Sequence, residues 1–488
     1  VYRQGEPSVK YRGIFLNNEE PSLASWVRGR YGGFNSFFYE DLFELLLRLK
    51  GNYLWPAREQ PVSFFRDDPF NLEKAKEYGI VIGTSPHEPM MRSWGEWERY
   101  GQGEWSYSNN AEAIKRFWAD GVELTRDYEK IITLGMYGEE DEPLVAEGTM
   151  EEKIAVMEMI IEEQRKILAE KIDPDLTRIP QLWALSGRVQ KYYEAGLQVP
   201  EDVTILLTDD NYGNVRMLPK PEERDRPGGY GLYYHFAYVG KPQSYRWVNT
   251  VPLPKIWQQM RLAYDYGVDR IWVVNVGGLK THEVATEFFL DMAYDIGKWQ
   301  KDNIAGFARQ WAEREFSPEY AADIGEIVMK YKKFNGRRKP EILFPDTYSL
   351  LNYREAERVL AEFAEVVFRA EEIYEALPAA KKDAYYQLVL YPARGSMNVL
   401  KLNIYAALNN FYAHQGRTKA NFYAELAGYI FTREAADTFY YNNKLAKGKW
   451  RGIIPGAHIG QTGWQPPEEN LMPEVKRLAV EEGSAMGV

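Results

Sequence analysis

Acidic, imidazole and amide side chains recur along the sequence at one kind of position, just after short apolar runs. Carboxyl and imidazole groups can act as general acids and bases, amides can hold hydroxyls, and Arg or Lys can hold a carboxylate. The polar and aromatic candidates at these positions are Asn18, Trp55, Glu59, His87, Tyr137, Glu142, Arg188, Asp209, Asn211, His235, Asn275 and Lys280. This combination is typical of hydrolysis of a polar, sugar-like substrate.

Each of these groups also has a purely structural interpretation. Asp209 or Asp210 can cap a turn, His87 can be a hydrogen-bonded structural histidine, and residues 139–142 can form a solvated acidic loop. Asn275 lies in the apolar stretch VVNVG, where an unpaired amide would cost about 1–3 kcal/mol, so it needs a partner or a ligand. Polar groups at the ends of all the runs are harder to explain by structure alone than any single one.

The apolar runs themselves are rich in β-branched and aromatic residues and occupy the first 300 residues. They are Tyr11–Leu16, Asn52–Pro56, Ile80–Ser85, Ile131–Gly135, Ile179–Leu185, Val203–Thr208, Gly231–Tyr238 and Arg270–Val276. Most are continuously apolar, as in VTILLT and IWVVNV, rather than alternating with polar residues. Strands that are buried on both faces have this pattern, which favours a parallel sheet.

Helical patterns separate most of these runs. One helix is predicted from apolar residues that share a face, namely Phe38, Leu42, Leu45 and Leu49. Further helices are predicted over 71–79, 110–129, 154–168, 187–196, 253–267 and 282–297. Only the sixth run is followed by a long loop, at 211–229. The alternation predicts an α/β fold, a (β/α)8 TIM barrel, with its chemistry at the C-terminal ends of the strands. The alternative is an open doubly wound sheet, but no phosphate-binding glycine turn follows the first strand.

The strand pattern stops near residue 300, where amphipathic helical patterns take over. These helices are predicted over 304–316, 318–334, 352–377, 380–418 and 420–446. We therefore expect a barrel of catalytic type over 1–300, an all-α helical bundle over 301–450 and an irregular segment over 451–488. The helices carry no cluster of polar groups, so we expect them to pack beside the barrel and to reach its mouth only through loops.

Composition narrows the class of protein and partner. Apolar residues make up 45% and charged residues 27% of the 488 residues, as in globular proteins with a large core. No apolar run approaches the roughly 20 residues that span a bilayer, and a net charge of −11 argues against a nucleic-acid partner. The chain begins at Val1 without a charged-then-apolar leader, so we expect no signal peptide in it. It has no Cys and no P-loop, GxSxG or HExxH motif, so we expect no metal and no cofactor.

Several segments resemble glycoside hydrolase family 115. They include KYRGIFLNNEEPSL, YGIVIGTSPHEPM, TLGMYGEEDEPL, VPEDVTILLTDDNYGN, YYHFAYVG, RIWVVNVGGLK and WRGIIPGAHIGQTGWQPP. The resemblance implies a secreted or periplasmic xylan α-1,2-glucuronidase, which removes glucuronic or 4-O-methylglucuronic acid side chains with inversion. It also implies that the chain corresponds to the central part of a longer enzyme. The expected partner is then an oligosaccharide or a smaller substrate.

The departures from the family pattern cluster at the expected mouth. After the fifth strand the family has Lys-Glu-Val-Gln, whose Glu is the candidate general acid, and Arg188 stands in its place here. Tyr137 stands where the family has Arg, and Glu59 is new relative to the family. The scaffold motifs are retained, whereas random drift would normally change the scaffold residues and the residues at the mouth alike. The pattern fits a natural chain with a changed site, and it fits a deliberately re-cut active site.

Three functions therefore remain open. The first is α-glucuronidase-type hydrolysis with Glu142 as acid or base, weakened because Arg188 cannot donate a proton at neutral pH. The residues that match family motif positions and would hold the uronic acid and a water are His87, Asp209, Asn211, His235 and Asn275. The second is a different reaction with Glu59 as carboxylate base. The third is a module that binds a uronic acid without turnover.

Overall fold

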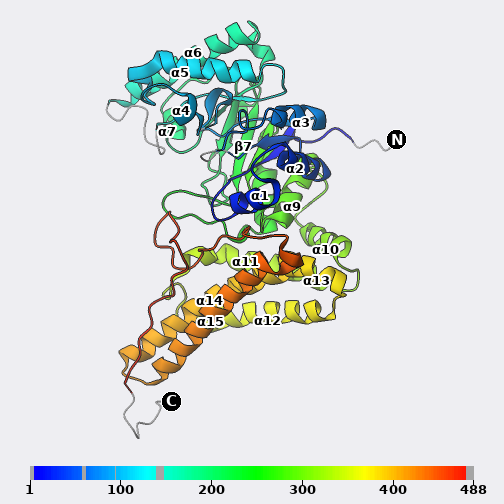
Figure 1. Cartoon of the computed structure of the whole chain (residues 1–488), viewed down its shortest axis with the longest axis vertical. Coiled ribbons are helices and arrows are strands. Elements are labelled where there is room, and N and C mark those ends of the chain that lie inside the picture. The colour runs from blue at the N-terminus through cyan, green and yellow to red at the C-terminus, as the bar shows by residue number, and fades with distance from the viewer. Residues whose placement is uncertain (1–4, 58–61, 94, 139–147, 480–488) are drawn as a thin grey trace.

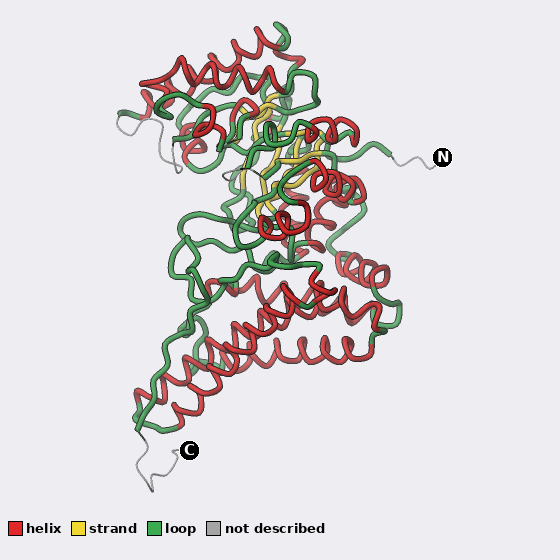
Figure 2. The backbone as a smooth tube through the Cα atoms, viewed as in Figure 1, coloured by secondary structure: helices red, strands yellow, loops and turns green. Residues whose placement is uncertain are grey.

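The computed structural model describes residues 5–57, 62–93, 95–138 and 148–479. Parallel strands curl around a common interior, with helices on the outside (Figure 1, Figure 2). The strands are β1 Tyr11–Phe15, β2 Tyr53–Trp55, β3 Val81–Ile82, β4 Ile132–Thr133, β5 Gln181–Ala184, β6 Thr204–Thr208, β7 Tyr230–His235 and β8 Ile271–Asn275. Each overlaps one of the predicted apolar runs.

The sheet closes on itself. Hydrogen-bonded neighbours follow the order β3-β2-β1-β8-β7-β6-β5-β4. The two ends of this order meet at a parallel bridge between Ile82 and Lys130, and the Ile131 N–H donates to the Ile82 carbonyl at 3.0 Å. The predicted fold class, a (β/α)8 barrel followed by helices, is therefore confirmed. The register places both Phe15 and His235 opposite Asn275, so the C-terminal ends of β1, β7 and β8 are level.

Alternate side chains of the strands fill the barrel interior. Phe15, Trp55 and Tyr233 contact one another with ring centroids 5.1 Å to 6.0 Å apart, in tilted and edge-on arrangements. Gly13 allows β1 to approach β2 closely, because a Cβ atom there would lie 1.9 Å from the Tyr53 carbonyl oxygen. The result is a packed aromatic floor beneath the C-terminal ends of the strands.

Helices surround the barrel. They are α1 Leu23–Tyr31, α2 Ser36–Arg48, α3 Phe70–Tyr78, α4 Glu96–Tyr100, α5 Tyr107–Leu124, α6 Met150–Lys171, α7 Arg188–Glu194, α8 Leu253–Asp265 and α9 Glu283–Tyr294. The predicted buried face of α2 was wrong in part. Leu45 is 41% exposed, and Tyr39, Phe43 and Leu46 are buried instead, because the helix packs along a neighbouring stripe. Helices α1 and α4 were not predicted, because segments of 9 and 5 residues are too short to show a clear helical period.

Helices continue after the barrel. They are α10 Ile304–Glu315, α11 Ala321–Arg337, α12 Glu355–Ala376, α13 Ala379–Tyr385, a π-helical turn Tyr386–Leu390, α14 Tyr391–His414 and α15 Lys419–Asn443. The long helices α14 and α15 lie side by side (Figure 1). The segment after them is irregular, and Asn409 and Asn421 bond the backbone of Lys476 and Leu478, which ties it to this pair. None of the helices in the described ranges combines the length and apolar character that a membrane span requires.

Candidate active site

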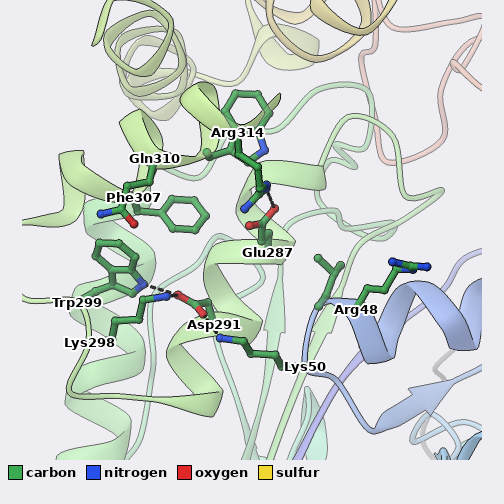
Figure 3. A pocket seen from close by; sticks show the side chains of 11 residues that line it. Arg48, Lys50, Glu287, Asp291, Lys298, Trp299, Phe307, Gln310 and Arg314 are labelled. Atoms are coloured by element: carbon green, nitrogen blue, oxygen red, sulfur yellow. Dashed lines mark hydrogen bonds and ion pairs between the residues drawn. The ribbon is translucent and has the colours of Figure 1, made fainter. Parts of the chain in front are cut away.

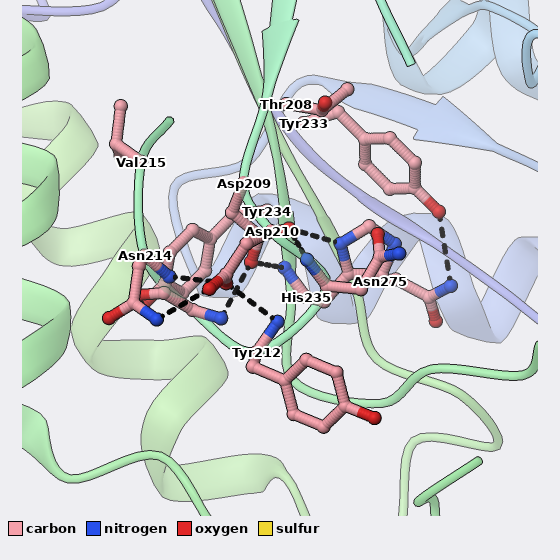
Figure 4. A network of polar contacts seen from close by, with 12 residues as sticks. Thr208, Asp209, Asp210, Tyr212, Asn214, Val215, Tyr233, Tyr234, His235 and Asn275 are labelled. Atoms are coloured by element: carbon pink, nitrogen blue, oxygen red, sulfur yellow. Dashed lines mark hydrogen bonds and ion pairs between the residues drawn. The ribbon is translucent and has the colours of Figure 1, made fainter. Parts of the chain in front are cut away.

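Asp209 and His235 form the central pair of the candidate site, at the ends of β6 and β7. The Asp209 Oδ1 atom lies 2.6 Å from the His235 Nδ1 atom (Figure 4). The same carboxylate accepts hydrogen bonds from the backbone N–H groups of Asn211 and Gly213, both at 3.0 Å, and of His235 at 3.2 Å. An ionised carboxylate only accepts hydrogen bonds, so His235 Nδ1 donates to Asp209 and Nε2 is the acceptor nitrogen of the ring. Asp209 is 2% exposed, so this orientation is fixed in the protein interior.

The neighbouring Asp210 has a different role. Its carboxylate accepts hydrogen bonds from the backbone of Tyr212 and Asn214 and from the Asn214 side chain, at 2.7–3.0 Å. Burial opposes ionisation, but these bonds outweigh it and lower the pKa of Asp210. Asp210 therefore caps the turn after β6, whereas Asp209 bonds the turn and also orients His235.

Asn275 at the end of β8 has the partners that the sequence required of it. Its Oδ1 atom accepts hydrogen bonds from Asn17 Nδ2 at 3.3 Å and from the Gly277 N–H at 2.9 Å. Its Nδ2 group donates to the Tyr233 hydroxyl at 3.2 Å (Figure 4). The amide is thus held by the protein itself, and it joins the rims of β1 and β7 beside His235.

His87, Tyr137 and Ser186 lie together after β3, β4 and β5. The His87 and Tyr137 rings have centroids 4.7 Å apart, and the Tyr137 hydroxyl lies 2.5 Å from the Ser186 hydroxyl. Val81, Ile131 and Leu182 point into the barrel, and every second residue after each of them leads to His87, Tyr137 and Ser186. Period-2 alternation from the interior of each strand is therefore a sequence signal that selects rim residues that face inward.

The other predicted residues lie in different environments. Trp55 is fully buried in the aromatic floor, where its indole N–H donates to the Tyr53 hydroxyl at 2.7 Å. The Lys280 ammonium bonds Glu283 at 2.6 Å and lies 4.0 Å from the centre of the Trp450 ring, so it is turned toward the C-terminal segment. Asn18 is buried at the end of β1. Glu59 and Glu142 lie outside the described residues, as does the side chain of Arg188.

Three residues at this rim, Arg246, Glu19 and Glu88, were not among the predicted site residues. Arg246, in the loop that follows β7, lies 3.7 Å from Glu19 (Nη1 to Oε1), and both side chains are largely buried. Glu88 is also buried and accepts a hydrogen bond at 2.8 Å from the Ser85 hydroxyl. Glu88 follows a predicted strand and was open to selection from the sequence. Arg246 lies in an irregular loop, where no periodicity marks it.

A cavity of ≈ 210 Å³ lies away from this site, beside the N-terminal ends of the strands (Figure 3). Asp291 of α9 lies at its wall and accepts hydrogen bonds from Lys50, Lys298 and the Trp299 indole N–H at 2.6–2.7 Å. Arg314 at the same wall is paired with Glu287 at 2.8 Å. These charges are matched to one another, so the cavity is a joint between the barrel and α10, and the chemistry belongs to the opposite end.

Comparisons with known proteins bear on the family and the fold of the chain. A model of glycosyl hydrolase family 115 matches residues 4–342. Among solved structures, the chain is similar to a family GH115 4-O-methyl-α-glucuronidase with specificity for decorated arabinogalactans, with 32% identity and a TM-score of 0.86. The match covers 99% of this chain and 65% of that one, so this chain spans less than two thirds of that enzyme's length.

A more distant structure shares the fold. It is a family 89 glycoside hydrolase from Clostridium perfringens in complex with GlcNAc-α-1,4-galactose, at 11% identity and a TM-score of 0.53. That match covers 88% of this chain and 54% of that one. No curated protein matches the sequence at a significant level.

Proposed function

Because the chain belongs to glycosyl hydrolase family 115, we propose that it is a glycoside hydrolase acting on polysaccharides decorated with glucuronic or 4-O-methylglucuronic acid. The bond cleaved is then the α-1,2 linkage to xylan or a corresponding linkage in arabinogalactan. Such substrates lie outside the cytoplasm, which favours a secreted or periplasmic protein. The Asp209–His235 pair carries this proposal, because it sets an oriented imidazole among buried amides at the barrel mouth.

The pair suits proton transfer at a sugar. With Nδ1 held by Asp209, the His235 Nε2 atom can accept a proton from a water or a sugar hydroxyl, and Asp209 stabilises the imidazolium that forms. An inverting reaction also needs a proton donor for the leaving oxygen; where acid and base are both carboxyl groups, these are typically about 6.5–9.5 Å apart. Glu142 is the residue we assign to that role. His87, Asn211 and Asn275 would hold the uronic acid and the attacking water.

The test is release of uronic acid by two matched variants. Asp209→Asn is expected to lower kcat about 10²–10⁴-fold, the usual contribution of a positioned acid or base, because the amide no longer fixes the His235 tautomer. Asp210→Asn removes a carboxylate with similar turn bonds but no contact to His235, and should stay near the wild-type rate. Decorated xylo-oligosaccharides and decorated arabinogalactan serve as substrates. An Asp209→Asn rate near that of wild type would exclude Asp209 from the reaction.

Arg188 favours one second candidate, a protein that binds a uronic acid without turnover. It replaces the residue that the family resemblance gives as the acid, and a guanidinium pairs well with a carboxylate. Calorimetry with free glucuronic acid, beside the release assay, separates the two. Binding without any released product supports the binder, and product release supports the hydrolase.

A further inference from the structure

Lys339 is a buried lysine that reaches the barrel from the helical region. It follows α11, just before a short 3₁₀ turn at Pro340–Ile342, and is 8% exposed. Its ammonium donates a hydrogen bond to the Thr250 hydroxyl at 2.5 Å. It also lies 3.6 Å from the centre of the Tyr245 ring, within the range of a strong cation–π contact. Both partners belong to the loop between β7 and α8, which borders the candidate site.

A continuous set of contacts leads from this lysine to the Asp209–His235 pair. The Tyr245 hydroxyl donates to the carbonyl of Asn211. The N–H of the same Asn211 donates to Asp209, and Asp209 orients His235. Asn211 has a φ of 66°, a left-handed conformation that needs local support in a residue other than glycine. The Tyr245 hydroxyl supplies that support from one side and Asp209 from the other.

Several charged groups surround Lys339. Glu341, Asp209 and Asp210 favour its charged form, whereas Lys255 opposes it. Burial is the largest effect and lowers the pKa of Lys339 to about 7. The Glu341 carboxylate accepts hydrogen bonds from the N–H groups of Arg246 and Trp247, at 2.7 and 2.9 Å. The Lys339–Ile342 segment therefore holds the backbone of the same loop that the Lys339 side chain contacts.

We infer that Lys339 is a positioning residue of the active site, which fixes Tyr245 and Asn211 and through them the Asp209–His235 pair. The inference rests on the proposed site but does not need turnover to be tested. Removing an ammonium from water is costly without compensating partners, so burial of Lys339 over the Tyr245 ring is not the arrangement of an ordinary surface lysine. The site would then depend on the helical region as well as on the barrel.

Lys332 offers a matched control. It is fully buried and belongs to α11, and its ammonium bonds the side chain of Asn249, one residue before Thr250, at 3.0 Å. Burial lowers the pKa of Lys332 to about 7, as it does for Lys339. Lys332 has no contact with Tyr245 among the described residues. Lys339→Met and Lys332→Met therefore remove similar buried charges from one interface, and only the first breaks the path to His235.

The experiment records long-range ¹H–¹⁵N spectra of the histidine rings without substrate. The chain has five histidines, and loss of one set of signals in His235→Gln assigns the ring of interest. We expect Lys339→Met and Tyr245→Phe to move the His235 signals, and Lys332→Met to leave them in place. Unmoved signals in Lys339→Met, or equal movement in Lys332→Met, would overturn the inference. If circular dichroism shows that Lys339→Met does not fold, Tyr245→Phe decides.

If the wild-type chain releases uronic acid, enzyme kinetics provide an independent test of the role of Lys339. Lys339→Met should lower kcat by about tenfold or more, equivalent to about 1.4 kcal/mol of barrier, with a smaller change in KM. A change in KM alone would contradict a positioning role. Absence of turnover in the wild-type chain would count against the proposed function, whereas the histidine spectra would still test Lys339.

Discussion

At the scale of the residue, Asp209 shows that a structural and a functional interpretation of one side chain need not compete. Asp209 and Asp210 are adjacent, and both accept hydrogen bonds from the turn that follows β6. Only Asp209 also reaches the His235 ring. The turn therefore pre-organises the carboxylate, which is what proton transfer at a fixed geometry requires.

Arg188→Glu is predicted to raise the rate of uronic acid release. Arg188 is the first residue of α7, and a glutamate there restores a group that can donate a proton. General acid catalysis is worth about 10²–10⁴-fold. If Arg188 takes the place of the family's acid, as the resemblance implies, the substitution also removes a positive charge that would oppose the charge developing on the sugar ring. Gly187 is kept, because its φ of 55° would strain a side chain. The measurement is kcat/KM on decorated xylo-oligosaccharide.

The control for Arg188 is Arg178→Glu, which changes an exposed arginine in the turn that precedes β5, at the opposite end of that strand from Arg188. It makes the same charge change and should leave the rate unaltered. Family-like turnover by the unchanged chain would show that Arg188 does not occupy the place of the acid.

At the scale of the element, Asp291 joins three segments that are distant in sequence. It lies on α9 and binds Lys50, which precedes β2, and Lys298 and Trp299, which precede α10. Burial alone would raise the pKa of Asp291, but the bonds from Lys298, Lys50 and Trp299 outweigh it and lower the pKa. The chain leaves the barrel for the helical region at this joint, so its geometry sets where α10 begins.

Asp291→Asn is predicted to destabilise the protein by about 1–3 kcal/mol, less than for a fully buried pair because both lysines are partly exposed. The midpoint of urea unfolding at pH 7 measures the loss. Because the pKa is lowered by folding, the contribution of Asp291 is present at neutral pH and disappears as pH falls through the folded value. The two proteins should therefore converge at low pH. Glu44→Gln breaks an exposed pair with Arg48 and should change the free energy of unfolding little. An equally large loss of stability in that variant would contradict the role of Asp291 at the joint.

At the scale of the whole molecule, the barrel and the helical region share one buried polar network around Asn249. The Asn249 side chain accepts a hydrogen bond from Lys332 of α11 and donates one to His282 Nδ1 at 3.1 Å. Its backbone N–H donates to the Thr281 hydroxyl at 3.2 Å. Asn249 and His282 are fully buried. The two parts are therefore expected to unfold together, because separating them would leave these groups unpaired.

His282 is predicted to make the molecule acid-sensitive. Burial, with Lys332 and Lys339 nearby, lowers the pKa of His282 to about 3. Below pH 6.5 the unfolded chain binds a proton there that the folded chain does not, so stability falls as pH drops from 6.5 toward 3. The cost between pH 7 and 4 is up to about 3 kcal/mol. Urea midpoints across this range should fall less steeply in His282→Gln than in wild type. His414→Gln changes a solvent-exposed histidine, and an equal change in slope there would exclude His282 as the cause.

The sequence by itself determined the fold and much of the rim. Strands that are buried on both faces have continuous runs of β-branched residues, so all of them were located from the sequence. Their C-terminal ends placed Asp209, His235 and Asn275 at one end of a barrel. Asn275 in an apolar strand also required a partner, because a buried amide without one is costly. These inferences succeed because they depend on local composition and on the regular geometry of parallel strands.

Only the tertiary structure decided which groups meet. Asn17 bonds Asn275 across 258 residues, and Asp209 bonds His235 across 26; strand order and register set such contacts, and no local pattern records them. Lys339 in the stretch NGRRKPEILF looks like a solvated charge, since its burial depends on how α11 packs against the barrel. The loop that carries Tyr245 and Arg246 has no periodicity, and its place at the mouth follows from partners supplied by the helical region.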